Sequence, residues 1–306
     1  MINMNNFQTI YDNDDIKEIF IAGDLHGDLM VLIILLRDCA KLIKKKKSNK
    51  NNYDNYLSEK NLEYVLSDKN SHSLGYEWVG DNKYFVLVGD LLDNYRMTIP
   101  HPDDQTRSYF ENPHEEIKLL LFINALNRDI RLNNKTGKII KLMGNHELMN
   151  TYLETNDHIS KFAKVINNGY RMSYFKIGQP GIDLLFDEGG IGVIVKIKDF
   201  VCVHGGLTDL LDKLPYKYDK TFCDLNTAIK KYMYTGIMDE PYSEIMFSES
   251  GILWNRQFGS ILPQNEKYRY TDMCPDLYKM FNKLCVGEDK CTNNTRLVIS
   301  HCTQFN

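Results

Sequence analysis

Short apolar runs that stop at a glycine recur along the first half of the chain. Residues 19–22, 84–88 and 139–143 are such runs, and each is followed at once by Gly-Asp or Gly-Asn. A short apolar run bounded by a turn residue is typical of a buried strand. We therefore predict three strands, each of which leads directly into a tight loop.

Helical spacing of apolar residues follows the first strand and precedes the third. The first set comprises Leu29, Leu32, Ile33, Leu36, Ala40 and Ile43. The second set lies within residues 115–132, where apolar positions recur with the period of an amphipathic helix. Strands that alternate with helices indicate an α/β domain with its helices packed on the outside.

The second half of the chain is richer in strands. Residues 191–197 and 199–203 are predicted to be adjacent antiparallel strands, the second of which runs into His204-Gly205-Gly206. A further run, residues 297–299, leads into Ser300-His301. This order of elements, αβ first and β-rich later, predicts packed sheets with helices outside them.

A length of 306 residues suits one large α/β domain. We expect a single domain over residues 16–306, with insertions at about 44–82 and 208–250, and a flexible N-terminus at 1–15. The longest apolar run, residues 29–36, is too short for a membrane span, and no signal-peptide core is visible. The expectation is a cytoplasmic protein without a membrane partner.

Composition removes several classes of function. The net charge is −4, so no overall basic field attracts nucleic acid, and none is predicted as a partner. The one basic run, residues 44–47, continues into a polar stretch and is typical of a solvated helix end. The seven cysteines form no CxxC pair, so neither a zinc ribbon nor a disulfide scaffold is predicted.

Candidate metal ligands follow every one of the predicted strand ends. The segments are Gly23-Asp24-Leu25-His26-Gly27, Gly89-Asp90-Leu91-Leu92-Asp93, Gly144-Asn145-His146-Glu147, His204-Gly205-Gly206 and Ser300-His301. Carboxylate oxygen, amide oxygen and imidazole nitrogen together suit Mn, Fe or Zn, without the thiolates of structural zinc. A single Gly-Asp pair is more often a turn than a ligand. Five such segments in this order predict a metal site, and Asp90 is the natural carboxylate to bridge two metal ions.

At these residues the chain resembles the calcineurin-like metallophosphoesterases and, within them, the phosphoprotein phosphatase family. The family pattern is GDxHG, GDxxDRG, GNHE, HGG and GHT; this chain has GDLHG, GDLLDNY, GNHE, HGG and SHCT. The longer forms GDLHGD, LMGNHELMN and VHGGL, with LWNR at 253–256, are similar to the Shewanella-like protein phosphatase branch. The resemblance implies a metallophosphoesterase-type β-sandwich, in which two packed mixed sheets are flanked by helices.

The resemblance also implies a role for each motif residue. Asp24, His26 and Asp90 would hold the first metal ion, and Asp90, Asn145, His204 and His301 the second. His146 would be the general acid, oriented by Asp93, while a hydroxide that bridges the metals attacks phosphorus directly. The two divalent ions are expected to be Mn, with Fe or Zn as alternatives.

The chain departs from the family pattern in three places, one of which is that the sequence ends five residues after His301, where the family usually continues with another strand or two. Asn94 replaces the phosphate-binding arginine, so Arg256, Arg96 and Arg171 become the candidates to bind substrate. Ser300 stands where the last motif has glycine. We expect His301 to be kept as a ligand on an altered turn.

Three functions are compatible with these motifs. The first is a phosphomonoesterase that acts on phosphorylated Ser/Thr or Tyr side chains of proteins, or on small phosphoesters. The second is a dinucleoside polyphosphate or nucleotide hydrolase, since substrate choice depends on loops such as 44–82 and 208–250. The third is a catalytically weak, phosphatase-like binding protein, suggested by Asn94 and Ser300.

Overall fold

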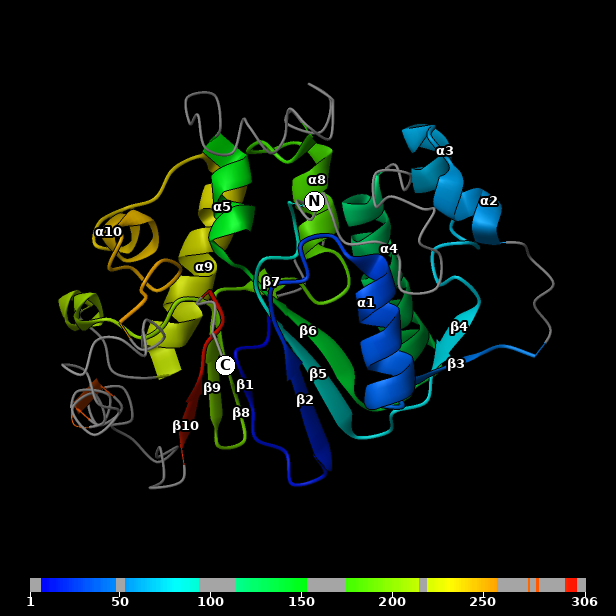
Figure 1. The fold of residues 1–306 in the computed structure, drawn as a ribbon. Helices are drawn as coiled ribbons and strands as arrows, with labels where there is room; N and C mark the ends of the chain where they lie inside the picture. The colour runs from blue at the N-terminus through cyan, green and yellow to red at the C-terminus, as the bar shows by residue number, and fades with distance from the viewer. Residues whose placement is uncertain are drawn as a thin grey trace, which may run out of the picture.

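Two four-stranded sheets form the centre of the protein (Figure 1). The structure is a computed structural model that describes residues 7–47, 53–93, 114–152, 174–214, 219–257, 275, 279–280 and 295–301. The first sheet, here called the parallel sheet, has the order β2 (Glu18–Ala22), β5 (Lys83–Val88), β6 (Lys138–Leu142) and β7 (Ile191–Gly192). All three of its strand pairings are parallel.

The second sheet, here called the mixed sheet, has the order β1 (Ile10–Tyr11), β8 (Ile194–Ile197), β9 (Phe200–Val203) and β10 (Arg296–Val298). β8 and β9 form an antiparallel pair, while β1 and β10 run parallel to their neighbours. β1 lies within the segment 1–15, and Tyr11 of this strand is buried.

The two sheets pack face to face, and helices cover their outer faces. The core between them consists of Val86, Val88, Ile140 and Leu142 from one sheet and Val195, Ile197 and Cys202 from the other. Each fully buried aliphatic side chain contributes about 1.5–3 kcal/mol of transfer free energy. The long helix α4 (Glu115–Leu132) packs on β6 and on α1 (Leu29–Ile34), whereas α9 (Asp219–Thr235) packs on β7 and β8 (Figure 1). The predicted α/β sandwich flanked by helices is confirmed, with one of the sheets parallel in the strands described.

Two predicted elements end differently in the structure. The first helix is predicted to include Ile43, but α1 continues only through a π-helical turn to Cys39. Lys41 then adopts a left-handed backbone (φ 54°), and Ile43 begins β3 (Ile43–Lys45). A left-handed residue redirects the chain out of a helix, which side-chain periodicity does not reveal.

The apolar run 191–197 does not form one strand. Its first residues belong to β7 of the parallel sheet and its last to β8 of the mixed sheet, with the crossing at Val193. Asn226 on α9 accepts hydrogen bonds from the N–H groups of Val193 (2.7 Å) and Ile194 (3.3 Å). These bonds satisfy the buried backbone where it leaves one sheet for the other.

The segments predicted as insertions are structured within the described residues. The first contains α2 (Tyr53–Ser58), α3 (Leu62–Ser67) and β4 (Tyr76–Trp78), which pairs with β3. Val65 and Trp78 are fully buried, so this region extends the core. The second contains a 3₁₀ turn (Asp209–Lys213), α9 and α10 (Tyr242–Phe247). Along the described part of the chain, no helix combines the length and apolar character required to cross a membrane.

Candidate metal centre

Five strands deliver the candidate residues to one end of the sandwich. Parallel strands present their carboxyl ends at the same edge of a sheet, where loops can assemble a site on a rigid scaffold. Asp24, Asp90 and Asn145 follow β2, β5 and β6, and His204 and His301 follow β9 and β10. The sandwich therefore brings together residues that lie far apart in the sequence.

Asp90 lies at the middle of this group. Its Oδ1 is 3.3 Å from Nε2 of His204, and its Oδ2 is 3.9 Å from Nε2 of both His26 and His146. Two compact sets of potential ligand atoms share it: one with His26 and His146, the other with His204 and His301. Burial opposes ionisation of Asp90, but the hydrogen bond and charge of His204 outweigh it and hold the pKa of this carboxyl below its usual value.

Backbone carbonyls fix which nitrogen two of the histidines present. Nδ1 of His26 lies 3.1 Å from the carbonyl oxygen of Leu92, and Nδ1 of His204 lies 2.8 Å from that of Val88. When Nδ1–H donates to a carbonyl, Nε2 carries a free lone pair, which is the form that binds metal. Nε2 of His204 then faces oxygen acceptors on Asp90 and on Asn145 (2.9 Å). Burial lowers the pKa of His204, but the hydrogen bond and charge of Asp90 outweigh it and raise this pKa, so without metal a proton on Nε2 joins these atoms. A divalent cation can take the place of that proton, so the residues present fit a metal ion.

His146 is held differently, by a carboxylate. Its Nδ1 lies 2.7 Å from Oδ2 of Asp93, and the Asn150 side-chain amide donates to both Asp93 oxygens (3.1 and 3.2 Å). Burial lowers the pKa of His146, but the hydrogen bond to Asp93 and the charge of Asp90 outweigh it and raise the pKa to about 9. The imidazole is therefore protonated at neutral pH and can donate a proton from Nε2.

The arginine candidates are only partly placed. Arg96, Arg171 and also Asn94 lie outside the described residues. Arg256 lies beside the centre, where its Nη1 donates a 3.0 Å hydrogen bond to the carbonyl oxygen of His301. The residue is exposed, so its guanidinium reaches the solvent side of the site. Trp254 also faces His301, with 6.4 Å between the ring centroids.

Comparison with known proteins agrees with this geometry. The family model described as calcineurin-like phosphoesterase matches residues 17–249, which is most of the sequence. The chain belongs to the calcineurin-like phosphoesterase family. It is accordingly a metal-dependent phosphoester hydrolase, and the family implies a centre of two divalent ions. A search of curated proteins finds no significant match to the sequence.

Solved structures share the fold of this phosphoesterase. A cold-active protein-tyrosine phosphatase of a psychrophilic Shewanella species is 16% identical, with a TM-score of 0.52 over 98% of this chain and 70% of that one. A point mutant of a cold-active protein tyrosine phosphatase is 17% identical, with the same TM-score over 99% of this chain and 71% of that one. At such low identity the likeness establishes the architecture alone.

Glu147 is a further residue of the phosphoesterase centre to which the sequence assigned no role. Its fully buried carboxylate accepts hydrogen bonds from the backbone N–H groups of Asp90, Leu91, Leu92 and Gly144, at 2.7–2.9 Å. Burial and the charge of Asp90 raise the pKa of Glu147, while the N–H groups of Gly144 and Leu92 lower it. One side chain thus ties the loop after β5 to the loop after β6. The signal was present as the last letter of GNHE, although nothing local shows which N–H groups it binds.

Several residues of the phosphoesterase centre have left-handed backbones. Positive φ values occur at Asp24 (53°), His26 (47°), Asp90 (53°), Asp93 (69°) and His301 (57°). Non-glycine residues rarely adopt this region, and such strain gathers at functional sites. Glycine is needed between them: a Cβ on Gly144 would lie 2.1 Å from Oδ1 of Asp90. The loops are therefore shaped to direct ligands inward.

Proposed function

We propose that Asp24, His26 and Asp90 hold one divalent ion and that Asp90, Asn145, His204 and His301 hold a second. The observation that carries this proposal is the position of Asp90, whose two oxygens face different groups of histidines. Geometrically, His146 completes the first compact set more readily than Asp24 does. We assign Asp24 on the resemblance of the motifs, which implies that His146 is the general acid and that Asp93 orients it.

The metal ions, when bound, supply positive charge to the phosphate oxygens and acidify a water molecule for direct attack on phosphorus. His146 acts on the leaving group: it donates the proton on Nε2 to the leaving oxygen. Asp93 keeps the imidazole in the required orientation through Nδ1, and Asn150 holds Asp93 in turn. General acid catalysis of this kind contributes about 10²–10⁴-fold to a rate.

Arg256 is the proposed clamp for substrate phosphate. It lies next to His301 and is exposed, and guanidinium groups bind phosphate oxygens in a planar, bidentate manner. Arg96 and Arg171 remain proposals from the sequence alone. Mn is the proposed ion, with Fe or Zn as alternatives, because the proposed ligands are oxygen and imidazole nitrogen atoms.

The proposed substrates are phosphorylated protein side chains, Ser/Thr or Tyr. Two solved structures that share this fold are protein tyrosine phosphatases, and this supports a phosphoprotein substrate. A dinucleoside polyphosphate or nucleotide hydrolase uses the same motifs and is the second candidate. The pairing of His146 with Asp93 is the arrangement expected of a general acid, and it therefore favours a catalytic function over a merely binding one.

A substrate panel tests this function directly. The Mn-loaded protein is assayed with p-nitrophenyl phosphate, with peptides that carry phosphotyrosine or phosphoserine, with bis(p-nitrophenyl) phosphate and with diadenosine tetraphosphate. We expect the highest kcat/KM for a phosphopeptide, no turnover after metal removal by a chelator, and a loss of about 10²–10³-fold in kcat for His146→Ala. Faster turnover of diadenosine tetraphosphate than of every phosphopeptide would transfer the assignment to the nucleotide hydrolases.

Metal stoichiometry separates the two roles assigned at the first site. His146→Ala is expected to retain two Mn ions per chain, whereas Asp24→Asn is expected to lose one. Atomic absorption after gel filtration measures both ratios. Loss of an ion in His146→Ala, with two retained in Asp24→Asn, would exchange the roles of these residues.

A further inference from the structure

Ser300 reaches from the last motif to the first. It follows β10, and its hydroxyl donates a 2.5 Å hydrogen bond to Oδ1 of Asp24, the residue that follows β2. Its backbone N–H donates a 2.8 Å bond to the carbonyl oxygen of His204. One residue therefore connects the loop of a proposed first-site ligand with the loop of a proposed second-site ligand.

The space around this hydroxyl fits Ser300 closely. A Cβ built on Gly23 would lie 2.1 Å from Oγ of Ser300 and 2.9 Å from its Cβ. Any side chain at position 23 would displace the serine, because contacts below 3.0 Å do not occur between such atoms. Gly23 and Ser300 thus form a matched pair, in which the missing side chain of one leaves room for the hydroxyl of the other.

Asp24 is the ligand that gains most from such support. Its side chain is 34% exposed, whereas that of Asp90 is 4% exposed and that of His204 is fully buried. Asp90 is held by its surroundings, but a partly exposed carboxylate such as that of Asp24 has more rotamers to lose when it binds a metal ion. A hydroxyl donor fixes one carboxylate oxygen and leaves the other available as a ligand.

We propose that Ser300 is a positioning residue that orients Asp24 for the first metal ion, in place of the glycine found in the family motif. This inference rests on the proposed function, since it takes Asp24 as a metal ligand. Partners that orient a ligand affect metal affinity by about 10–100-fold when they are removed. We expect Ser300→Ala to weaken the first Mn site by about that factor and to leave the second site almost unchanged.

Isothermal titration of the metal-free protein with Mn²⁺ tests the proposal. The variants are Ser300→Ala, Asp24→Asn and the double variant, with Ser300→Gly as a second substitution. Ser71→Ala is the matched control, because the Ser71 hydroxyl also donates to a carboxylate, that of Asp68 at 2.7 Å, in the loop after α3. Electron paramagnetic resonance gives an independent readout, since two coupled Mn²⁺ ions differ from a single ion in spectrum.

Each outcome decides between support and rejection. Support consists of a weaker first site in Ser300→Ala and Ser300→Gly, a single-ion spectrum at limiting Mn²⁺, unchanged binding in Ser71→Ala, and no further loss when Ser300→Ala is added to Asp24→Asn. If wild type binds two ions and Ser300→Ala binds them equally well, Ser300 has no positioning role, and the proposed function stands. If wild type binds no ion, the proposed function fails and this inference fails with it.

Discussion

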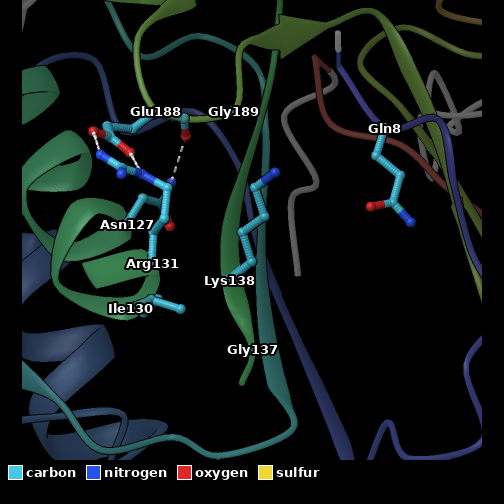
Figure 2. Close-up of a pocket in the computed structure, with 8 residues that line it drawn as sticks. All are labelled: Gln8, Asn127, Ile130, Arg131, Gly137, Lys138, Glu188 and Gly189. Carbon is cyan, nitrogen blue, oxygen red and sulfur yellow. Dashed lines mark hydrogen bonds and ion pairs between the residues drawn. The ribbon is translucent and has the colours of Figure 1, made fainter. Parts of the chain in front are cut away.

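The two ends of strand β6 present a contrast within one element. Its carboxyl end leads to Gly144 and Asn145, where side-chain oxygens of Asn145 and Asp90 converge on Nε2 of His204, so that a proton or a metal ion can hold these atoms together. Its amino end, Lys138, lines a pocket of about 390 Å³ together with Asn127, Arg131 and Glu188 (Figure 2). Both ends are polar and partly buried, but their polar atoms are satisfied in different ways.

At the amino end each charged group has partners. Glu188 accepts hydrogen bonds from both Arg128 (2.9 Å) and Arg131 (2.9 and 3.1 Å), as Figure 2 shows for Arg131. The side chain of Asn127 forms three hydrogen bonds with the backbone. Its NH₂ group donates to the carbonyl oxygens of Ile139 and Glu188, and its oxygen accepts from the N–H of Ile139. Lys141, further along β6, donates to Asn124 (2.7 Å) and to the carbonyl oxygen of Asp187 (3.0 Å).

The difference distinguishes a structural network from a reactive one. A satisfied network holds α4, β6 and the segment after α8 (Pro180–Phe186) together and gains nothing from a ligand. At the carboxyl end the oxygen and imidazole nitrogen atoms can bind either protons or metal ions, so metal binding there displaces protons. Substitutions at the carboxyl end should therefore reduce metal binding and kcat/KM, whereas substitutions at the amino end should reduce only the free energy of unfolding.

The largest effect is expected for Asp90→Asn. The amide removes the charge that both proposed ions share, so metal binding should be lost and kcat/KM should fall by about 10³-fold or more. Metal analysis and the p-nitrophenyl phosphate assay measure both. Glu188→Gln is the matched control, since it makes the same chemical change at the other end of the sheet. Equal activity of the two variants would remove the contrast between the ends.

Glu147→Gln comes next, because it replaces one of two oxygens that together accept four backbone N–H bonds. The side-chain NH₂ group of glutamine is a hydrogen-bond donor, so it cannot accept the backbone N–H bonds that this oxygen accepts. We expect the free energy of unfolding to fall by about 2–4 kcal/mol and kcat to fall with it, as the Asp90 loop shifts. Urea denaturation of the metal-free protein gives the stability. An unchanged unfolding midpoint together with full activity would show that this carboxylate does not support the loops.

For Glu188→Gln itself we expect a moderate loss of stability and no loss of activity. Arg131 loses its ion pair with Glu188, whereas Arg128 keeps its ion pair with Asp187, and both arginines are at least partly exposed, so the cost is about 1–2 kcal/mol. The unfolding midpoint and kcat/KM are measured on the same preparation. A fall in kcat/KM of tenfold or more at saturating Mn²⁺ would mean that the amino end influences the reaction.

The last prediction concerns the pH dependence of stability, where the expected change at any one pH step is small. Burial lowers the pKa of Lys141 from its ordinary value of 10.5 to about 7, although Asp187 opposes this. Between these values the unfolded chain binds a proton that the folded protein does not, so stability rises with pH over this window. Lys141→Met should reduce that slope by at most about 1.4 kcal/mol per pH unit. Urea midpoints at pH 7, 8 and 9 test it; an identical slope in both proteins would contradict the assigned burial effect.

The sequence predicts the strand ends well because each ends in a local signal. β2, β5 and β6 lie within one residue of the predicted runs, and α4 has the predicted bounds. A glycine after an apolar run and a helical period are both properties of neighbouring residues. Each of the five ligand segments follows a predicted strand, and this made it possible to predict that the segments lie close together.

What the sequence does not reveal depends on contacts between distant residues. No local pattern shows that the run 191–197 divides between two sheets, because strand periodicity is the same in either. Glu147 and Asn150 act on partners beyond their own loop or helix turn, and the hydroxyl of Ser300 binds a residue 276 positions away. Ser300 was expected only to alter a turn, whereas its side chain makes a bond of its own.

The pairing of β10 with β9 also sets an order of events during synthesis. The proposed ligands other than His301 all precede residue 205, but His301 and the positioning residue Ser300 are synthesised much later and must return to the mixed sheet beside β9. Closing so long a segment of chain is entropically costly and slow. With the proposed ligands, a nascent chain would carry Asp24, Asp90 and Asn145 before the second proposed metal site is complete, and that site would be completed only once β10 has paired.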